Sequence, residues 1–282
     1  MSAPQGGRRA CVIGWPVAHS RSPLIHGYWL KHYGIEGSYT RQSVPPEGLA
    51  DFIGQLSSLG FVGCNVTLPH KEAVYRLVET SDPTTRRIEA VNTVTMQEGR
   101  LIGLNTDACG FVAHLRSVLP DWSGKGAEVL VLGAGGAARA IVAGLLGEGV
   151  NCILISNRTA ARGRALAEHF GPKVTAVDWA AIPQQLTRCD LLVNTTLLGM
   201  AGQPALDIDL AGLAPGAAVA DIVYVPLQTD LLGQARARGH RVVDGLGMLL
   251  HQAVPGFELW FGARPEVTPE LRALVEADLG GR

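Results

Sequence analysis

The sequence has 282 residues, enough for two domains that each bury a core of their own, and we expect two domains. Its 24 Lys and Arg residues nearly balance its 25 Asp and Glu residues, which argues against nucleic acid or an anionic membrane as a partner. Any anionic ligand must therefore be bound by local groups, and no apolar stretch approaches the roughly 20 residues that span a bilayer.

The cysteines and histidines indicate neither a disulfide framework nor a metal site. The five cysteines are an odd number and lie far apart, which is typical of reduced packing residues and predicts a cytoplasmic protein. The eight histidines include no metal-binding spacing, so we expect no bound metal.

The first hundred residues predict alternating strands and helices. Strands are expected at 11–14, 38–44 and 61–68, and helices at 23–33 and 46–59. This β-α-β-α-β order implies a parallel sheet. Residues 91–96 and 101–105, joined through Glu98-Gly99, predict a β-hairpin that is added to the sheet.

A helix at 108–119 leads into residues 120–126, a polar stretch that contains two glycines. Such composition is typical of connectors, so it predicts a domain boundary at 120–126.

A glycine-rich turn follows a strand expected at 127–132. Gly133-Ala134-Gly135-Gly136-Ala137-Ala138 matches the G-x-G-x-x-G/A pattern, in which the first glycine allows the tight turn and the second lets the backbone approach a pyrophosphate. A helix and a second strand at 152–156 follow in the order of a dinucleotide-binding unit, so the turn predicts a bound dinucleotide.

Asn157-Arg158-Thr159 ends that second strand, and Arg162 lies three residues further on. An NAD-binding unit has a carboxylate near this point, which accepts hydrogen bonds from the ribose 2′-hydroxyl. A guanidinium instead forms charge-assisted bonds with a 2′-phosphate, so Arg158 and Arg162 favour NADP(H). The simpler alternative for Arg158 is a solvated side chain at a strand end.

The second β-α series continues to about residue 245. Strands are expected at 190–194, 218–224 and 241–244, followed by an apolar helix at 248–261. Thr268 is the expected cap of a final helix, with Pro269 at its first position. The expected apolar face of that helix is Leu271, Leu274, Val275 and Leu279.

Three polar clusters interrupt the apolar periodicity of the N-terminal half. The first, His19-Ser20-Arg21-Ser22-Pro23, is interpreted as a helix cap with Ser22 at the N-cap and Pro23 at N1; its two hydroxyls also suit a substrate carboxylate. In the second, 65–71, Lys71 lies in the first turn of a helix, where the helix dipole disfavours it.

The third cluster comprises Asn92 and Asn105-Thr106-Asp107. Asp107 could simply be the N-cap of the helix that starts at Ala108. A lysine and an aspartate at the carboxyl ends of strands can also converge on one ligand crevice, which is the second interpretation of Lys71 and Asp107.

Taken in order, these motifs resemble the shikimate dehydrogenase family over nearly the whole chain. The matching segments are Ser20-x-Ser22-Pro23, Asn65-x-Thr67-x-Pro69-x-Lys71, Ala90-Val91-Asn92-Thr93, Asn105-Thr106-Asp107-x-x-Gly110, Gly133-Ala134-Gly135-Gly136-Ala137, Asn157-Arg158-Thr159-x-x-Arg162 and Asp244-Gly245-Leu246-Gly247-Met248-Leu249. The resemblance implies an NADP-dependent oxidoreductase that reversibly reduces 3-dehydroshikimate to shikimate, on the route to chorismate and aromatic amino acids.

The resemblance also implies an α/β fold with two domains. A substrate-binding and catalytic domain with a mainly parallel sheet would comprise residues 1–107 plus 246–282. A Rossmann-type NADP-binding domain would comprise residues 108–245.

Site residues follow from the same resemblance. Lys71 and Asp107 would be catalytic, with Lys71 as the acid/base residue. Substrate would be bound by Ser20, Ser22, Thr67, Lys71, Asn92, Asp107, Tyr224 and Gln252. The cofactor NADP(H) would be bound by Gly133, Ala134, Gly135, Gly136, Ala137, Asn157, Arg158, Thr159, Arg162, Ile222 and Gly245.

Two alternatives stay open. A quinate or aminoshikimate-type dehydrogenase would share this fold, because the hydroxyls that such an enzyme recognises depend on pocket shape. A non-catalytic dinucleotide-binding regulator would share it too, but the joint presence of Lys71, Asp107 and Asn92 argues against one. We expect a monomer or a homodimer.

Overall fold

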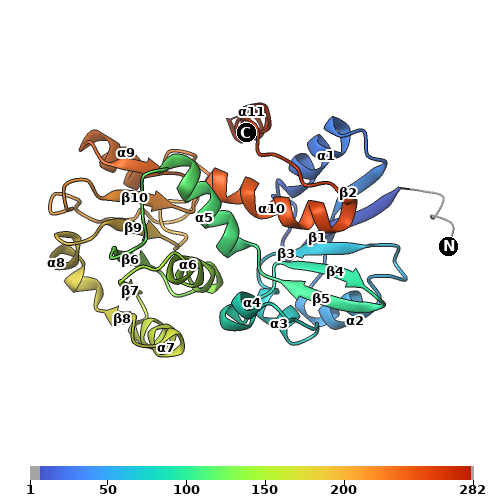
Figure 1. Ribbon diagram of the computed structural model, residues 1–282, viewed down its shortest axis with the longest axis horizontal. Coiled ribbons are helices and arrows are strands. Elements are labelled where there is room, and N and C mark those ends of the chain that lie inside the picture. Colours follow the sequence, from blue (N-terminus) through green and yellow to red (C-terminus); the bar gives the residue numbers. More distant parts are fainter. Residues whose placement is uncertain (1–6, 281–282) are drawn as a thin grey trace. The chain divides into compact units, whose positions relative to one another are not determined.

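The computed structural model describes residues 7–280, which form two compact units. Unit 1 contains the chain up to Thr106 together with Gln252–Asp278, and unit 2 contains Asp107–His251 and the chain from Leu279. The chain passes between the units at the start of helix α5 (Asp107–Val118) and again within helix α10 (Gly245–Phe261) (Figure 1).

The connector at 120–126 lies inside unit 2, so the domain boundary predicted there is wrong. The physical reason is the packing of α5 on helix α6 (Gly136–Gly147). Gly144 of α6 lies so close to α5 that an added Cβ would be 3.1 Å from the Ala108 carbonyl oxygen and 3.1 Å from Val112 Cγ2. The polar connector therefore joins two elements of the same unit.

Unit 1 is built on a five-stranded sheet, sheet A, with strand order β2-β1-β3-β4-β5 among the described residues. The strands are β1 (Arg8–Gly14), β2 (Gly37–Ser43), β3 (Gly63–Val66), β4 (Thr93–Gln97) and β5 (Arg100–Leu104). Strands β1, β2 and β3 are parallel, and β4 is antiparallel to β3 and to β5. The predicted parallel sheet with an added hairpin is confirmed. Glu98 and Gly99 have φ angles of 50° and 78°, as a two-residue hairpin turn requires.

The helices predicted for unit 1 form with other bounds, and the sequence did not indicate the helix at Pro83–Ile88. The helices of unit 1 are α1 (Ser22–His32), η1 (Pro46–Gly48), α2 (Leu49–Gly54), α3 (Lys71–Tyr75), α4 (Pro83–Ile88), the end of α10 and most of α11 (Pro269–Gly280). Thr268 caps α11 as predicted, because its Oγ1 accepts the N–H of Leu271 at 3.3 Å. Leu271 and Val275 are buried, but Leu274 is 38% exposed, so its place on the apolar face was predicted wrongly.

Unit 2 is built on sheet B, whose six described strands are all parallel and are ordered β11-β10-β9-β6-β7-β8. The strands are β6 (Glu128–Leu132), β7 (Cys152–Ser156), β8 (Val174–Val177), β9 (Leu191–Asn194), β10 (Ala218–Asp221) and β11 (Arg241–Val243). The remaining helices are α7 (Ala160–Phe170), η2 (Trp179–Ala181), α8 (Ile182–Leu186) and α9 (Asp230–Ala237). This is the Rossmann strand order, in which ligands bind at the carboxyl ends of the strands where the order reverses, here between β6 and β9. The sequence did not indicate β8.

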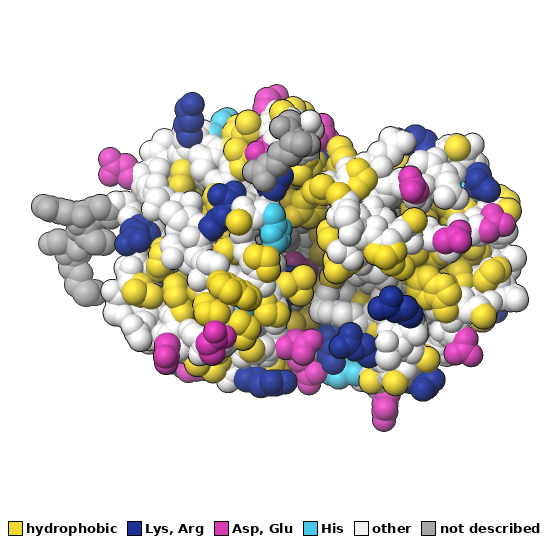
Figure 2. Space-filling view, turned by 180° about the vertical axis from the view of Figure 1, so that it is seen from behind, with side chains coloured by type: hydrophobic (Ala, Val, Ile, Leu, Met, Phe, Trp, Pro, Cys, Tyr) yellow, Lys and Arg dark blue, Asp and Glu magenta, His cyan; other side chains and the backbone are white. Residues whose placement is uncertain are grey.

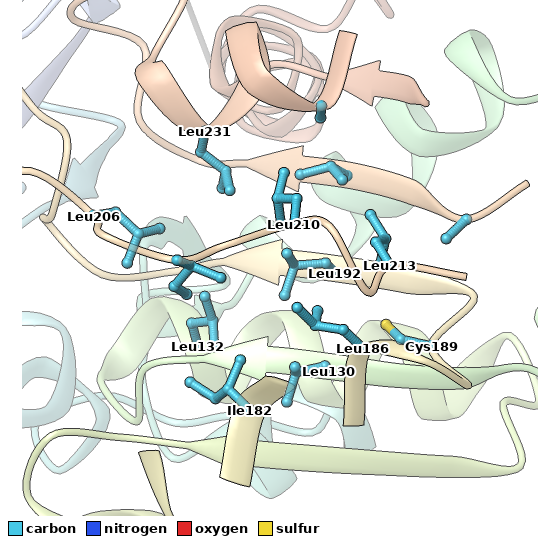
Figure 3. Close-up of a cluster of buried hydrophobic side chains, with 14 of the residues drawn as sticks. Leu130, Leu132, Ile182, Leu186, Cys189, Leu192, Leu206, Leu210, Leu213 and Leu231 are labelled. Carbon is cyan, nitrogen blue, oxygen red and sulfur yellow. The ribbon is translucent and has the colours of Figure 1, made fainter. Parts of the chain in front are cut away.

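The core of unit 2 covers both faces of sheet B. On one face, shown in Figure 3, strand residues such as Leu130, Leu132 and Leu192 contact Ile182 and Leu186 of α8. The strand residues that alternate with these leucines are also fully buried. Because successive side chains of a strand point to opposite faces, the alternating residues form a second layer on the other face of sheet B. Burial on both sides is typical of parallel sheets and holds the strand ends in fixed positions.

Three features of the described residues concern the partners that the protein could bind: its helices, its surface charges and its potential metal ligands. No helix within residues 7–280 has the length and apolar character that crossing a membrane requires. On the face drawn in Figure 2, basic and acidic side chains are both scattered over the surface. Residues 7–280 contain no cluster of three or more potential metal ligands.

Candidate active site

The loop between β1 and α1 holds two serine hydroxyls side by side. Ser20 Oγ lies 3.2 Å from Ser22 Oγ and accepts the N–H of Ser22 at 3.3 Å. Arg41 on β2 donates from Nε and Nη2 to the Ser20 carbonyl oxygen, at 3.0 and 2.6 Å. Helix α1 begins at Ser22 and its N-cap is Arg21, so the predicted Ser22 cap is wrong. The Ser22 hydroxyl contacts Ser20 instead of a helix N–H, which leaves both hydroxyls in one place for a ligand.

Lys71 occupies the first position of α3, as the motif predicts. It is half-buried, and its carbonyl oxygen accepts the N–H of Val91 at 2.9 Å. Thr67 precedes it, at the end of β3, and its carbonyl accepts the N–H of His70 at 3.0 Å. Gly14 permits this arrangement, because a Cβ there would lie 2.5 Å from Thr67 Cγ2. The end of β1, the end of β3 and the start of α3 are thus locked together.

Asn92, Thr106 and Gln252 form one hydrogen-bonded group. The N–H of Thr106 donates to Asn92 Oδ1 at 2.7 Å, and Asn92 Nδ2 donates to Gln252 Oε1 at 3.3 Å. Thr106 Oγ1 donates to the Gln252 carbonyl oxygen at 2.8 Å. Two predicted site residues that are far apart in the sequence therefore lie together. Thr106, which orients both of them, was missed, although it stands inside the Asn-Thr-Asp motif.

A buried polar layer lies next to this group. Tyr39 donates its hydroxyl to Asn65 Oδ1 at 2.6 Å, and burial raises the pKa of Tyr39 well above its ordinary value, so the phenol keeps its proton. Asn65 Nδ2 donates to the Asn92 carbonyl oxygen and to Thr93 Oγ1, each at 3.1 Å. The layer fixes the backbone of Asn92. The sequence contained no signal for the role of Tyr39, which comes from a different strand.

Asp107 is the first residue of α5 and is buried. Helix α5 therefore starts one residue earlier than predicted, and Asp107 is part of the helix and not its N-cap. It belongs to unit 2 and follows directly on Thr106, the last residue of the first segment of unit 1.

The glycine-rich turn of unit 2 has the geometry that a dinucleotide requires. Gly133 has a φ angle of 112°, and a Cβ there would lie 2.5 Å from Thr195 Oγ1. A Cβ at Gly135 or Gly136 would meet no atom within 4 Å, so the space above the turn is open to a ligand. Ala138, the third small residue of the pattern, is fully buried. The turn leads into the N-terminus of α6, where free N–H groups favour an anion, so these residues fit a pyrophosphate.

The residues after β7 suit a second anionic group. Asn157 Nδ2 donates to the Thr159 carbonyl oxygen at 2.9 Å, which closes the turn, and Thr159 is the N-cap of α7. Arg158 and Arg162 are exposed, and neither forms an ion pair with another described residue. Both guanidinium groups are therefore available to a phosphate.

The loop after β10 contacts the start of α10. A Cβ at Gly245 would lie 2.2 Å from the Ile222 carbonyl oxygen and 2.7 Å from that of Val223, so only glycine fits there. Tyr224 is half-buried two residues after Ile222. The loop is anchored by buried Asp221, which accepts the N–H of Val223 at 3.0 Å; burial raises the pKa of Asp221 to about 6.

Family comparisons cover most of the chain. Residues 12–94 match the shikimate dehydrogenase substrate binding domain, residues 116–199 match the shikimate / quinate 5-dehydrogenase model, and residues 245–274 match the shikimate 5′-dehydrogenase C-terminal domain.

Individual relatives extend over the full length. The shikimate dehydrogenase (NADP(+)) of Nitrobacter winogradskyi is 56% identical over 279 residues, 99% of each chain. The solved shikimate 5-dehydrogenase of Thermus thermophilus, in complex with NADP(H) and shikimate, is 38% identical with a TM-score of 0.84, over 97% of this chain and 98% of that one. A quinate dehydrogenase of Corynebacterium glutamicum, in complex with NAD, is 31% identical with a TM-score of 0.89, over 97% of this chain and all of that one.

Proposed function

Because the chain belongs to the shikimate dehydrogenase family, we propose that it is an NADP-dependent oxidoreductase that reversibly reduces 3-dehydroshikimate to shikimate, a step in chorismate and aromatic amino acid biosynthesis. The observation that carries the proposal is the position of Lys71. It starts a helix at the carboxyl end of β3, and its carbonyl is bonded to Val91, the neighbour of Asn92. A cation and a group of hydrogen-bonding side chains are thus held at one edge of sheet A.

In this proposal, residues 1–107 and 246–282 bind substrate and residues 108–245 bind the cofactor. The cofactor residues are Gly133, Ala134, Gly135, Gly136 and Ala137 at the pyrophosphate, Asn157, Arg158, Thr159 and Arg162 at the 2′-phosphate, and Ile222 and Gly245 along the nicotinamide. We also propose a cytoplasmic location, since all five cysteines are free thiols.

The substrate residues have distinct tasks. Ser20 and Ser22 donate their hydroxyl protons to the substrate carboxylate, which suits a loop that already holds the two oxygens 3.2 Å apart. Thr67, Asn92, Asp107 and Gln252 bind the ring and its hydroxyls, and Tyr224 contacts the substrate from the loop after β10. The fixed orientation of Asn92 and Gln252 selects for hydroxyls at matching positions.

Lys71 is the acid/base residue of the proposed reaction. When bound, NADPH supplies the hydride that reaches the ketone carbon. As the carbonyl oxygen gains negative charge, the Lys71 ammonium stabilises that charge and then donates a proton from Nζ to the oxygen. In the reverse direction, the Lys71 amine accepts the hydroxyl proton. Asp107 is proposed to hold the ammonium in place.

The test follows NADPH oxidation and, in parallel, NADH oxidation by the purified protein with 3-dehydroshikimate and, separately, with 3-dehydroquinate. We expect turnover with the first ketone, and Lys71→Ala should lower kcat by roughly 100-fold or more with a smaller effect on KM. Lys31→Ala, which removes an exposed lysine of α1, is the control and should keep full activity. Near-normal turnover of Lys71→Ala would refute the assignment.

A quinate dehydrogenase is the second candidate, because a solved enzyme of that activity matches nearly the whole chain. Activity with 3-dehydroquinate alone would establish it. Activity with NADH alone would contradict the assignment of Arg158.

A further inference from the structure

A buried histidine of unit 2 contacts the start of α10 from outside the proposed site. His114 lies on α5, which crosses the beginning of α10 (Figure 1), and its side chain is 5% exposed. The His114 ring packs directly on Gly247, since a Cβ at Gly247 would lie 2.0 Å from His114 Nδ1 and 2.1 Å from Cε1. Gly247 must therefore be glycine for the ring to occupy this place.

The polar edge of the ring faces a carboxylate. His114 Nε2 lies 3.7 Å from Asp244 Oδ1, and it has no hydrogen-bond partner among the described residues. Nδ1 lies 3.4 Å from the hydroxyl oxygen of Ser117, whose proton is donated to the His114 carbonyl oxygen at 2.7 Å. The nearby carboxylate favours a proton on Nε2, directed at Asp244. His251, whose ring centroid lies 6.0 Å from that of His114, is neutral, because burial and the nearby His114 lower its pKa to about 4.

Asp244 in turn holds the first turn of α10. Its Oδ1, the atom that faces His114, accepts the N–H of Gly247 at 3.2 Å, which is the bond of an N-cap residue to the third position of its helix. Gly245, the residue after Asp244, lies so close to the Ile222 carbonyl oxygen that no side chain fits there. A shift of the Asp244 carboxylate would therefore move Gly245 against the Ile222 carbonyl, in the loop that Asp221 anchors.

We propose that His114 is a positioning residue for the nicotinamide end of the cofactor site, acting through Asp244 and the start of α10. The proposal rests on the proposed function, in which Ile222 and Gly245 lie along the nicotinamide. His114 touches neither substrate nor cofactor. Its effect is to fix the carboxylate that caps the helix, and it should leave the adenosine end of the site unchanged.

The test compares binding of NADP⁺ with binding of 2′,5′-ADP, which has the 2′-phosphate but lacks the nicotinamide, by titration calorimetry on the full chain. For His114→Gln we expect the Kd of NADP⁺ to rise about fivefold or more, while the Kd of 2′,5′-ADP changes less than about twofold. The kcat should fall and the KM for shikimate should stay the same. His240→Gln is the control: the His240 ring contacts the Ala217 carbonyl oxygen at 3.1 Å, and His240 precedes β11, whereas Asp244 follows it at the other end of the strand.

A double variant separates positioning from general packing. If His114 acts through Asp244, then His114→Gln added to Asp244→Asn should weaken NADP⁺ binding no further than Asp244→Asn alone. Equal losses of both ligands in His114→Gln, or no loss of either, would overturn the proposal, because the histidine would then support the whole unit or nothing. A wild-type protein that binds 2′,5′-ADP but not NADP⁺ would likewise overturn it, whereas one that binds neither ligand would refute the proposed function itself.

Discussion

Arg21 Nε lies 2.6 Å from Asp278 Oδ2, so an ion pair joins the serine loop to the last turns of α11. The Arg21 side chain is 8% exposed, and Nη1 also donates to the His19 carbonyl oxygen at 2.6 Å. Arg21, which stands between the two serines in the sequence, thus anchors the loop. The C-terminal helix thereby supports a loop that the proposal assigns to the substrate carboxylate.

Asp278→Asn should loosen this loop and leave a buried arginine without its counter-ion. We expect the KM for shikimate to rise about three- to tenfold with an unchanged KM for NADPH, and the free energy of unfolding to fall by about 1–2 kcal/mol. The expected cost is below the roughly 3–5 kcal/mol of a fully buried pair, because the Asp278 side chain is 36% exposed. Steady-state kinetics and urea unfolding measure the two effects.

Glu276→Gln is the control on the same helix. Glu276 pairs with Arg272 at 2.8 Å on the surface, where an i,i+4 pair contributes only about 0.3–0.5 kcal/mol. If Asp278→Asn and Glu276→Gln behave alike, the Arg21 pair does not support the loop.

Thr106→Val should disturb the orientation of Asn92 and Gln252 without changing the size of the side chain. Loss of the hydroxyl leaves buried polar atoms of both partners less well satisfied, at a cost of about 1–3 kcal/mol in unfolding free energy. The KM for shikimate should rise, whereas NADP⁺ binding should not change. Thr106→Ser keeps the hydroxyl and should restore the KM; a serine variant as impaired as the valine one would assign the effect to packing.

Most of the fold could be predicted from periodicity and turn chemistry. The Glu98-Gly99 hairpin and the Gly133 turn were located because each depends on local backbone geometry that few residues tolerate. The boundary at 120–126 was wrong for the opposite reason. A polar connector has the same composition whether it separates two units or joins two packed elements of one, and the contact of α5 with Gly144 decides which.

The site residues that sequence reasoning missed act through contacts between distant segments. Tyr39 and Thr106 orient Asn65 and Asn92 through hydrogen bonds between segments far apart in the sequence, which no local motif reveals. The Ser22 cap was predicted one residue late because Ser-Pro fits a helix start at either register. Local motifs thus indicated the side chains that are proposed to meet a ligand, whereas the side chains that hold them required the three-dimensional structure.

Arg158→Ala tests the preference for NADPH. Arg158 is exposed and forms no ion pair with another described residue, so its removal should affect only a bound anion. Loss of a charge-assisted bond of about 1.5–3 kcal/mol lowers kcat/KM for NADPH roughly 10- to 100-fold, with little change for NADH. Arg164→Ala removes another exposed arginine of α7 and serves as the control. Equal losses with both cofactors would mean that Arg158 does not bind the 2′-phosphate.

Asp221→Asn tests the electrostatic cost of the buried carboxylate that anchors the Ile222 loop. Burial raises the pKa of Asp221 from 3.8 to about 6, although Val223, Thr229 and Asn194 all donate to it. Between these two pH values the folded state binds more protons than the unfolded state. The Asp221 contribution to stability is therefore fully present below about pH 4 and is lost as the pH rises to about 6.

Asn at this position does not ionise, so the variant should gain stability relative to wild type as the pH rises from about 4.5 to about 7, by at most about 3 kcal/mol. Urea unfolding of both proteins across this range measures the difference. Asp209→Asn is the control, because the Asp209 side chain is 76% exposed and its ion pair with Arg238, at 3.6 Å, lies on the surface. A stability difference between Asp221→Asn and wild type that is the same at every pH would show that Asp221 is already fully ionised in the folded protein throughout the range. In that case its hydrogen bonds from Asn194, Val223 and Thr229 outweigh the effect of burial.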